Sequence, residues 1–184
     1  MLAAAAVLLA GLWAHAQHRR EQAELALHDG QRQLHDGRDP AAAVQTLQRG
    51  LGLLDGLPFE RDLRGRLGAR LATARRLHLA EQLHRLGDEI RSLYGVDAIP
   101  VKRLRSLVTE CDAFWQRRDA VAGSLDAARD PDVAADLQDV AIFAAHLQVK
   151  LGASAVEVNA GRREALRLLD EAEAMFGSSA VLEY

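Results

Sequence analysis

The sequence contains little cysteine, proline or aromatic residue, and these shortages exclude several classes of protein. Its 184 residues include one cysteine, four prolines and 4% aromatic residues. A single cysteine excludes an internal disulfide framework and any zinc site built from several cysteines. The formal net charge of −3 at pH 7 gives no indication of a general polyanion-binding protein. None of these features identifies a reaction.

The residues that are abundant favour helices. Hydrophobic residues make up 49% of the chain and charged residues 27%, which is typical of a chain that buries a core. Alanine, leucine, arginine, glutamate and glutamine are frequent, whereas β-branched residues are few, and this balance favours helix over sheet. We therefore predict an all-α fold without strands.

The N-terminus begins with an uncharged apolar run. Residues 1–14 carry no charge, and Arg19 and Arg20 follow shortly after them. The run is short, because a membrane-spanning helix needs about 20 apolar residues. Trp13 beside the two arginines fits an anchor at the membrane interface, whereas a secretory signal would carry a basic residue before the run. We predict that residues 1–16 are a membrane anchor, or the last part of one; a cleaved signal peptide and a buried helix are the alternatives.

Apolar residues continue at helical spacing through the rest of the chain. Residues 17–58 predict a first helical hairpin, with Asp39 as a helix cap and Pro40 as the first helical residue. Its connections are expected at residues 37–38 and at residues 55–58.

A central block and a second hairpin are predicted to follow. Residues 59–118 predict a central block with one long helix, or two helices broken near Gly87, then a turn at 95–99 and a shorter helix in which Trp115 is expected to be buried. Residues 119–184 predict the second hairpin, with a helix start at Asp130 and a strong helix over 162–176. A final helix that begins near residue 181 is expected to be incomplete.

The two predicted hairpins share a spacing of small and large residues. The two sets are Ala43, Leu47 and Gly50, and Ala165, Leu169 and Ala172. This arrangement is similar to the second helix of a tetratricopeptide repeat, in which small residues let paired helices approach closely. The separation of the two sets is not a whole multiple of the roughly 34-residue repeat. We therefore predict degenerate tetratricopeptide-like hairpins, with an ordinary antiparallel helix pair as the alternative.

Five short segments carry a family resemblance. They are LHRL at 83–86, IRSLYG at 90–95, Ile99-Pro100, FWQRR at 114–118 and EALRLLDEAEA at 164–174. Together they resemble the region behind the single membrane helix of planctomycete serine/threonine protein kinases, which are bacterial signalling proteins. The resemblance implies a tetratricopeptide-like sensor or interaction segment that lies outside the cytoplasm. The positive-inside rule, applied to Arg19 and Arg20, implies a cytoplasmic body instead, and we follow the resemblance.

No kinase residue is carried over from that family. The chain has no Gly-rich nucleotide loop, strand lysine or Asp-Phe-Gly motif. The tripeptide Arg61-Asp62-Leu63 matches part of a kinase catalytic loop, but Glu60 replaces the histidine and Leu67 stands where the metal-binding asparagine would fall. We predict that this chain is not an enzyme, although it could be the accessory part of a kinase encoded upstream.

Other candidates for chemistry also lack the partners they need. Of the seven histidines, His28 and His35 share a helical face whereas His78 and His84 do not, and none belongs to a His-Glu-x-x-His motif. Cys111 has no base at helical spacing, so we predict a buried core residue. We predict no catalytic residue, no metal and no cofactor.

Two further motifs are candidates for ligand sites. The densest basic run comprises Arg61, Arg64, Arg66, Arg70, Arg75 and Arg76. It has no interleaved aromatic residues for stacking bases, so we predict a solvated helix face, with a partner-binding face as the alternative and no nucleic acid. The glycines at positions 50 and 52 do not form a phosphate loop, because no strand precedes them.

These predictions combine into one functional hypothesis. We expect a non-catalytic, membrane-tethered, helical-repeat module that binds a protein or peptide partner on the extended surface of its paired helices. The alternative is a soluble, secreted helical bundle that acts as a protein-binding scaffold.

Overall fold

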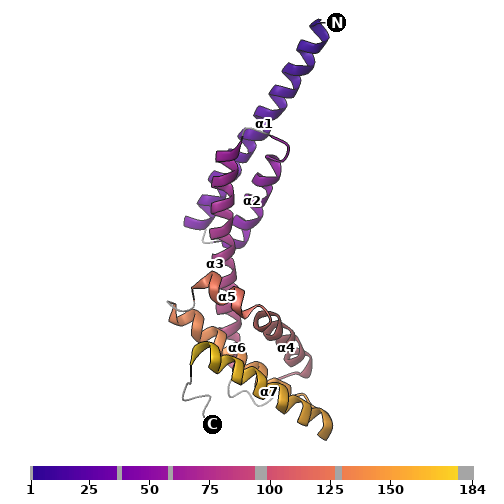
Figure 1. The fold of residues 1–184 in the computed structure, drawn as a ribbon, viewed down its shortest axis with the longest axis vertical. Helices are drawn as coiled ribbons and strands as arrows, with labels where there is room; N and C mark the ends of the chain where they lie inside the picture. Colours follow the sequence, from indigo (N-terminus) through magenta and orange to yellow (C-terminus); the bar gives the residue numbers. More distant parts are fainter. Residues whose placement is uncertain (1, 37–38, 58–59, 94–98, 127–129, 178–184) are drawn as a thin grey trace. The chain divides into compact units, whose positions relative to one another are not determined.

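The computed structural model describes residues 2–36, 39–57, 60–93, 99–126 and 130–177, and all regular structure within these ranges is helical. The helices are α1 (Leu2–His35), α2 (Pro40–Leu53), α3 (Arg61–Leu93), α4 (Val101–Trp115), α5 (Arg118–Leu125), α6 (Pro131–Lys150) and α7 (Ala155–Phe176) (Figure 1). The prediction of an all-α fold is confirmed for these residues. The predicted turns at 37–38, 58 and 95–98 and the incomplete helix near 181 lie outside the described ranges.

The chain divides into two compact units, residues 1–78 and residues 79–184. The division falls inside α3, and therefore inside the central block predicted at 59–118. The reason lies in the apolar face of α3, since Leu63 and Leu67 belong to the core of the first unit whereas Leu86 and Ile90 belong to the core of the second. Within the described residues, no helix combines the length and apolar character needed to cross a membrane.

The first unit is built on close contact between α1 and α2. The predicted cap is present, because the Asp39 carboxylate accepts a hydrogen bond from the backbone N–H of Ala42 at 2.9 Å and Pro40 begins α2. A Cβ added at Gly30 would lie 2.6 Å from Leu47 Cγ, and one at Gly50 would lie 2.9 Å from Ala26 Cβ. Small residues therefore set the separation of these two helices.

The second unit packs α4, α5, α6 and α7 with the C-terminal part of α3 around one core. Asp130 caps α6 as predicted, accepting hydrogen bonds from the N–H groups of Asp132 and Val133. The predicted start of the last helix at residue 162 is wrong, because α7 begins at Ala155. Ser154 accepts from the N–H of Glu157, as in a capping box, and Glu157 accepts at 2.8 Å from the N–H of Ala153, the residue before the cap.

The predicted alternative of a helix break near Gly87 is also wrong, because α3 is continuous through this residue. Gly87 is buried against α6 instead, and a Cβ added to it would lie 2.6 Å from the Oδ1 atom of Asp136. The glycine thus permits a close approach between a helix backbone and a buried carboxylate.

Candidate functional site

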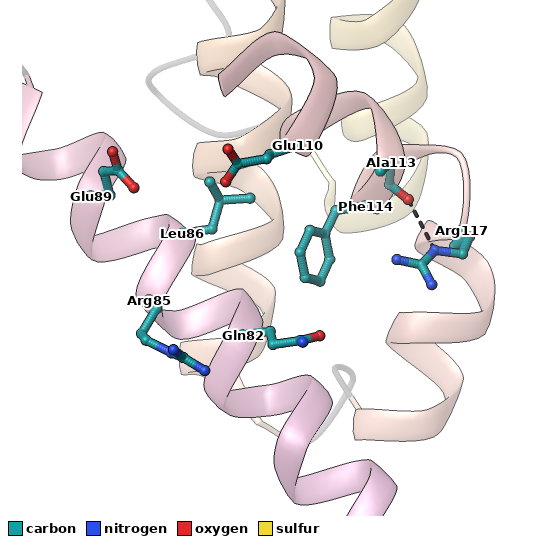
Figure 2. A pocket seen from close by; sticks show the side chains of 8 residues that line it. All are labelled: Gln82, Arg85, Leu86, Glu89, Glu110, Ala113, Phe114 and Arg117. Atoms are coloured by element: carbon teal, nitrogen blue, oxygen red, sulfur yellow. Dashed lines mark hydrogen bonds between the residues drawn. The ribbon is translucent and has the colours of Figure 1, made fainter. Parts of the chain in front are cut away.

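The second unit has a groove of about 440 Å³ between the C-terminal part of α3 and the end of α4. Figure 2 shows the side chains of Leu86 and Phe114 pointing into it from the two helices. These two residues are only 5% and 9% exposed. They form an apolar floor, and the side chains that line the groove cover most of it. The remaining lining residues are Gln82, Arg85, Glu89, Glu110, Ala113 and Arg117.

The acidic side chains of the groove are already paired. Arg103, near the start of α4, forms ion pairs with Glu89 on α3 and with Glu110, which lies about two turns further along α4. The Nε–H of Arg103 donates to Glu89 at 2.9 Å, and the Ser106 hydroxyl donates to Glu110 at 2.9 Å. One arginine therefore pairs with two carboxylates and links α3 to α4 at this end of the groove.

The basic side chains of the groove have weaker partners. The Nε–H of Arg117 donates to the backbone carbonyl of Ala113 at 3.0 Å, drawn as the dashed line in Figure 2. Its guanidinium carbon lies 5.9 Å from the centre of the Phe114 ring, which is within the range of a cation–π contact. No carboxylate of the described chain forms an ion pair with Arg117, whereas Arg85 has only Glu81, at 3.7 Å on the same helix.

A second polar cluster, centred on the buried carboxylate of Asp136, joins α3 to α6. Asp136 is 3% exposed and forms ion pairs with Arg91 and with His84, whose Nδ1 lies 3.0 Å from Asp136 Oδ2. Arg91 also donates to Asp139 at 2.8 Å and to Asp88 at 2.9 Å. A buried charge is tolerated only when it is paired in this way. The hydrogen bond and charge of Asp136 raise the pKa of the largely exposed His84.

The sequence analysis did not identify the Asp136 cluster, although one signal for it existed. Asp136 lies on the same face of α6 as Val133, Leu137 and Val140, all of which are buried. An acidic residue on an apolar helical face requires a basic partner on a facing element. One of the two basic partners is a histidine, because His84 lies against Asp136. His84 does not pair with His78, the nearest histidine in the sequence. The other basic partner is Arg91.

A third polar cluster surrounds Trp115 and joins α4 to α7. Trp115 is 2% exposed, which confirms its predicted burial. Its indole N–H donates to Glu171 at 3.0 Å, and Arg118 pairs with the same carboxylate at 3.1 Å while its guanidinium lies 5.2 Å from the indole centre. Arg167 pairs with Glu171 from the other side. The tryptophan is therefore a structural anchor for α7, with both its ring and its N–H engaged.

Cys111 and the histidines occupy ordinary structural positions. Cys111 is fully buried in the second core, and burial raises the pKa of its thiol to about 12. His28 contacts Arg32 on its own helix, and His35 is exposed. Among the described residues, no group of three or more histidine, cysteine, aspartate or glutamate side chains is arranged to hold a metal ion.

The basic run of α3 lies on its exposed side. All six arginines between residues 61 and 76 are exposed. Arg64 donates to the carbonyl of Leu54 at 2.6 Å and so satisfies the end of α2, while Arg66 pairs with Asp62. Leu63 and Leu67 are core residues, so the Arg61-Asp62-Leu63 tripeptide is part of a packed helix and not of a loop.

Comparison with known proteins places the chain in no family. No protein-family model, curated protein or solved structure matches it. The function is therefore inferred from the residues and from the geometry of the groove.

Proposed function

We propose that this chain is a non-catalytic interaction module whose second unit binds a protein or peptide segment in the groove between α3 and α4. The observation that carries the proposal is the groove itself, which combines an apolar floor of Leu86 and Phe114 with charged walls. Such a combination is typical of sites that take one apolar side chain and orient it with a few polar contacts. The Arg103–Glu89 ion pair supports a preformed groove, because it connects the two helices that form the groove and so reduces the ordering cost of binding.

The N-terminal part of α1 is proposed to tether the module to a membrane. Trp13 is 68% exposed, and Ala10 and Ala14 are exposed beside it. The first buried residue of the first core in chain order is Ala23, so the apolar run precedes the part of α1 that packs on α2. A membrane interface would cover Trp13 in particular. By its resemblance to the kinase-associated region, the helical body is proposed to lie outside the cytoplasm.

The tetratricopeptide-like arrangement is likewise a proposal. It is supported in the first hairpin by Ala43, Leu47 and Gly50, all of which are buried; Leu47 lies against Gly30 of α1, and Gly50 lies against Ala26 of α1. In the second set Ala165 and Ala172 are buried, but Leu168 is the fully buried large residue and Leu169 is only partly buried. The segment would then serve as the accessory, signal-receiving part of a serine/threonine protein kinase, as the resemblance implies.

A binding selection tests the proposed module. The full chain, purified in a mild detergent, is immobilised and exposed to a phage-displayed library of random 12-residue peptides, with empty detergent micelles as the subtraction control. We expect peptides that bind the chain saturably and compete with one another for one site. A library that yields no such peptide would contradict the binding function.

Fractionation of expressing cells tests the tether. We expect the full chain to pellet with membranes and to resist carbonate extraction, while a chain beginning at Gln17 stays in the supernatant. The shorter chain keeps every buried residue of both cores, so its folding serves as the control. If both chains stay soluble and the N-terminal sequence of the mature protein begins after residue 16, the secreted scaffold is the better interpretation.

A further inference from the structure

We infer that the groove is specific for an acidic peptide segment, with a large apolar side chain on Leu86 and Phe114 and a neighbouring carboxylate on Arg117. This inference rests on the proposed binding function and adds the chemistry of the partner. Its basis is the unequal state of the charges that line the groove.

The carboxylates of the groove are not available to a basic ligand. Glu89 and Glu110 both pair with Arg103, and Glu110 also accepts from Ser106. A lysine or arginine of a partner would have to compete with an intramolecular arginine that is already in place. Displacing such a pair gains little, because one ion pair is exchanged for another of the same kind.

The guanidinium of Arg117 is available to an acidic ligand. Only its Nε–H is bonded within the described chain, to Ala113, and a guanidinium has five N–H donors. The four remaining donors on its two terminal nitrogens suit a two-point contact with a carboxylate, which is the strongest polar contact that arginine makes. The Phe114 ring under this group favours one orientation of the side chain and lowers the entropy lost on binding.

Arg85 places a second positive charge on the opposite wall of the groove. It is paired weakly, with Glu81 at 3.7 Å, so a ligand carboxylate can recruit it at low cost. From Gln82 to Glu89 the wall formed by α3 extends about 10 Å, since a helix rises 1.5 Å per residue. An extended peptide of about three residues covers that length. The groove therefore suits a short motif of one apolar residue flanked by acidic residues.

The peptide selection described above tests the inference, followed by fluorescence anisotropy with the selected peptides in synthetic form. We expect enrichment of Asp and Glu beside Leu, Ile, Met or Phe. We expect Arg117→Glu to weaken binding at least tenfold and Arg85→Glu to weaken it less. Arg105→Glu is the matched control, because Arg105 is an exposed arginine of α4 outside the groove, and we expect less than a twofold change. Circular dichroism and urea midpoints verify that each variant is folded.

The outcomes separate the inference from the function on which it rests. Peptides that bind saturably but are not acidic, or whose affinity is the same for Arg117→Glu and Arg105→Glu, would overturn the acidic specificity and leave the binding module standing. The absence of any binding peptide would overturn both. If Arg117→Glu fails to fold, Arg85→Glu and the charge-neutral Arg117→Gln decide the question, with loss of affinity expected in both.

Discussion

Substitution of Gly87 by alanine should destabilise the second unit, against the trend that helix propensity sets. In an exposed helix this change stabilises by up to about 1 kcal/mol. At Gly87 the new methyl group would lie 2.6 Å from Asp136 Oδ1 and 3.1 Å from its Cγ. The carboxylate cannot turn aside freely, because Arg91 and His84 both hold it. Overpacking costs about 1–3 kcal/mol, and weakening the pairing of a buried charge adds to that. We expect a net loss of about 1–3 kcal/mol.

Two other helical glycines serve as controls for the effect of helix propensity. A Cβ added at Gly65, also on α3, or at Gly123, in the second unit, would have nothing within 4 Å. Each substitution to alanine should therefore stabilise by a few tenths to about 1 kcal/mol. Urea unfolding followed by circular dichroism and tryptophan fluorescence measures all three. If Gly87→Ala stabilises the second unit as Gly123→Ala does, the close approach of α3 to Asp136 is refuted.

Three further predictions concern the second unit. Trp115→Ala should cost about 3–5 kcal/mol, and Trp115→Phe should cost less, because the phenyl ring still fills most of the buried space although the hydrogen bond to Glu171 and part of the packing are lost; a urea-measured loss below about 1 kcal/mol for alanine would contradict burial. The pKa of His84 is raised in the folded chain, so protonated His84 stabilises the fold. This stabilisation is complete below the pKa of the unfolded chain, near 6.5, and is lost as the pH rises through the pKa of the folded chain. The urea midpoint should therefore fall more between pH 6 and pH 9 in the parent than in His84→Gln. Cys111, with its thiol pKa raised to about 12, should react with a disulfide reagent only after urea unfolding, and rapid labelling of the native chain would be evidence against its burial.

Local signals in the sequence were sufficient wherever a few neighbouring residues determine the structure. The caps at Asp39 and Asp130 lie next to the prolines that begin their helices, so both helix starts were predictable. The same logic applied to Ser154 and Glu157 would have placed the start of α7 correctly. The start of α7 is therefore encoded locally, because Ser154 and Glu157 have the Ser-x-x-Glu spacing of a capping box.

Long-range pairing could not be predicted in the same way. Gly87 resembles a helix breaker until Asp136 is known to lie against it, and nothing near Gly87 in the sequence reveals that contact. Trp115 was predictable as a buried residue from its helical spacing, but its partner Glu171 belongs to a helix 56 positions away. The groove depends on the same kind of information, because its walls come from two helices whose placement is fixed by the core and by Arg103.

The state of the charged side chains is the basis of the binding function proposed for the second unit. Asp136, Glu171 and Glu89 each pair with an arginine of another helix, so their charges hold helices together. A group engaged in this way is poorly suited to bind a ligand, since the ligand must first displace its partner. Arg117 differs from them, because it combines free donors, a position on the groove wall and contact with the apolar floor. In the described part of this unit, the proposed recognition therefore depends on Arg117, and changing its charge should alter binding while the helix-joining pairs stay intact.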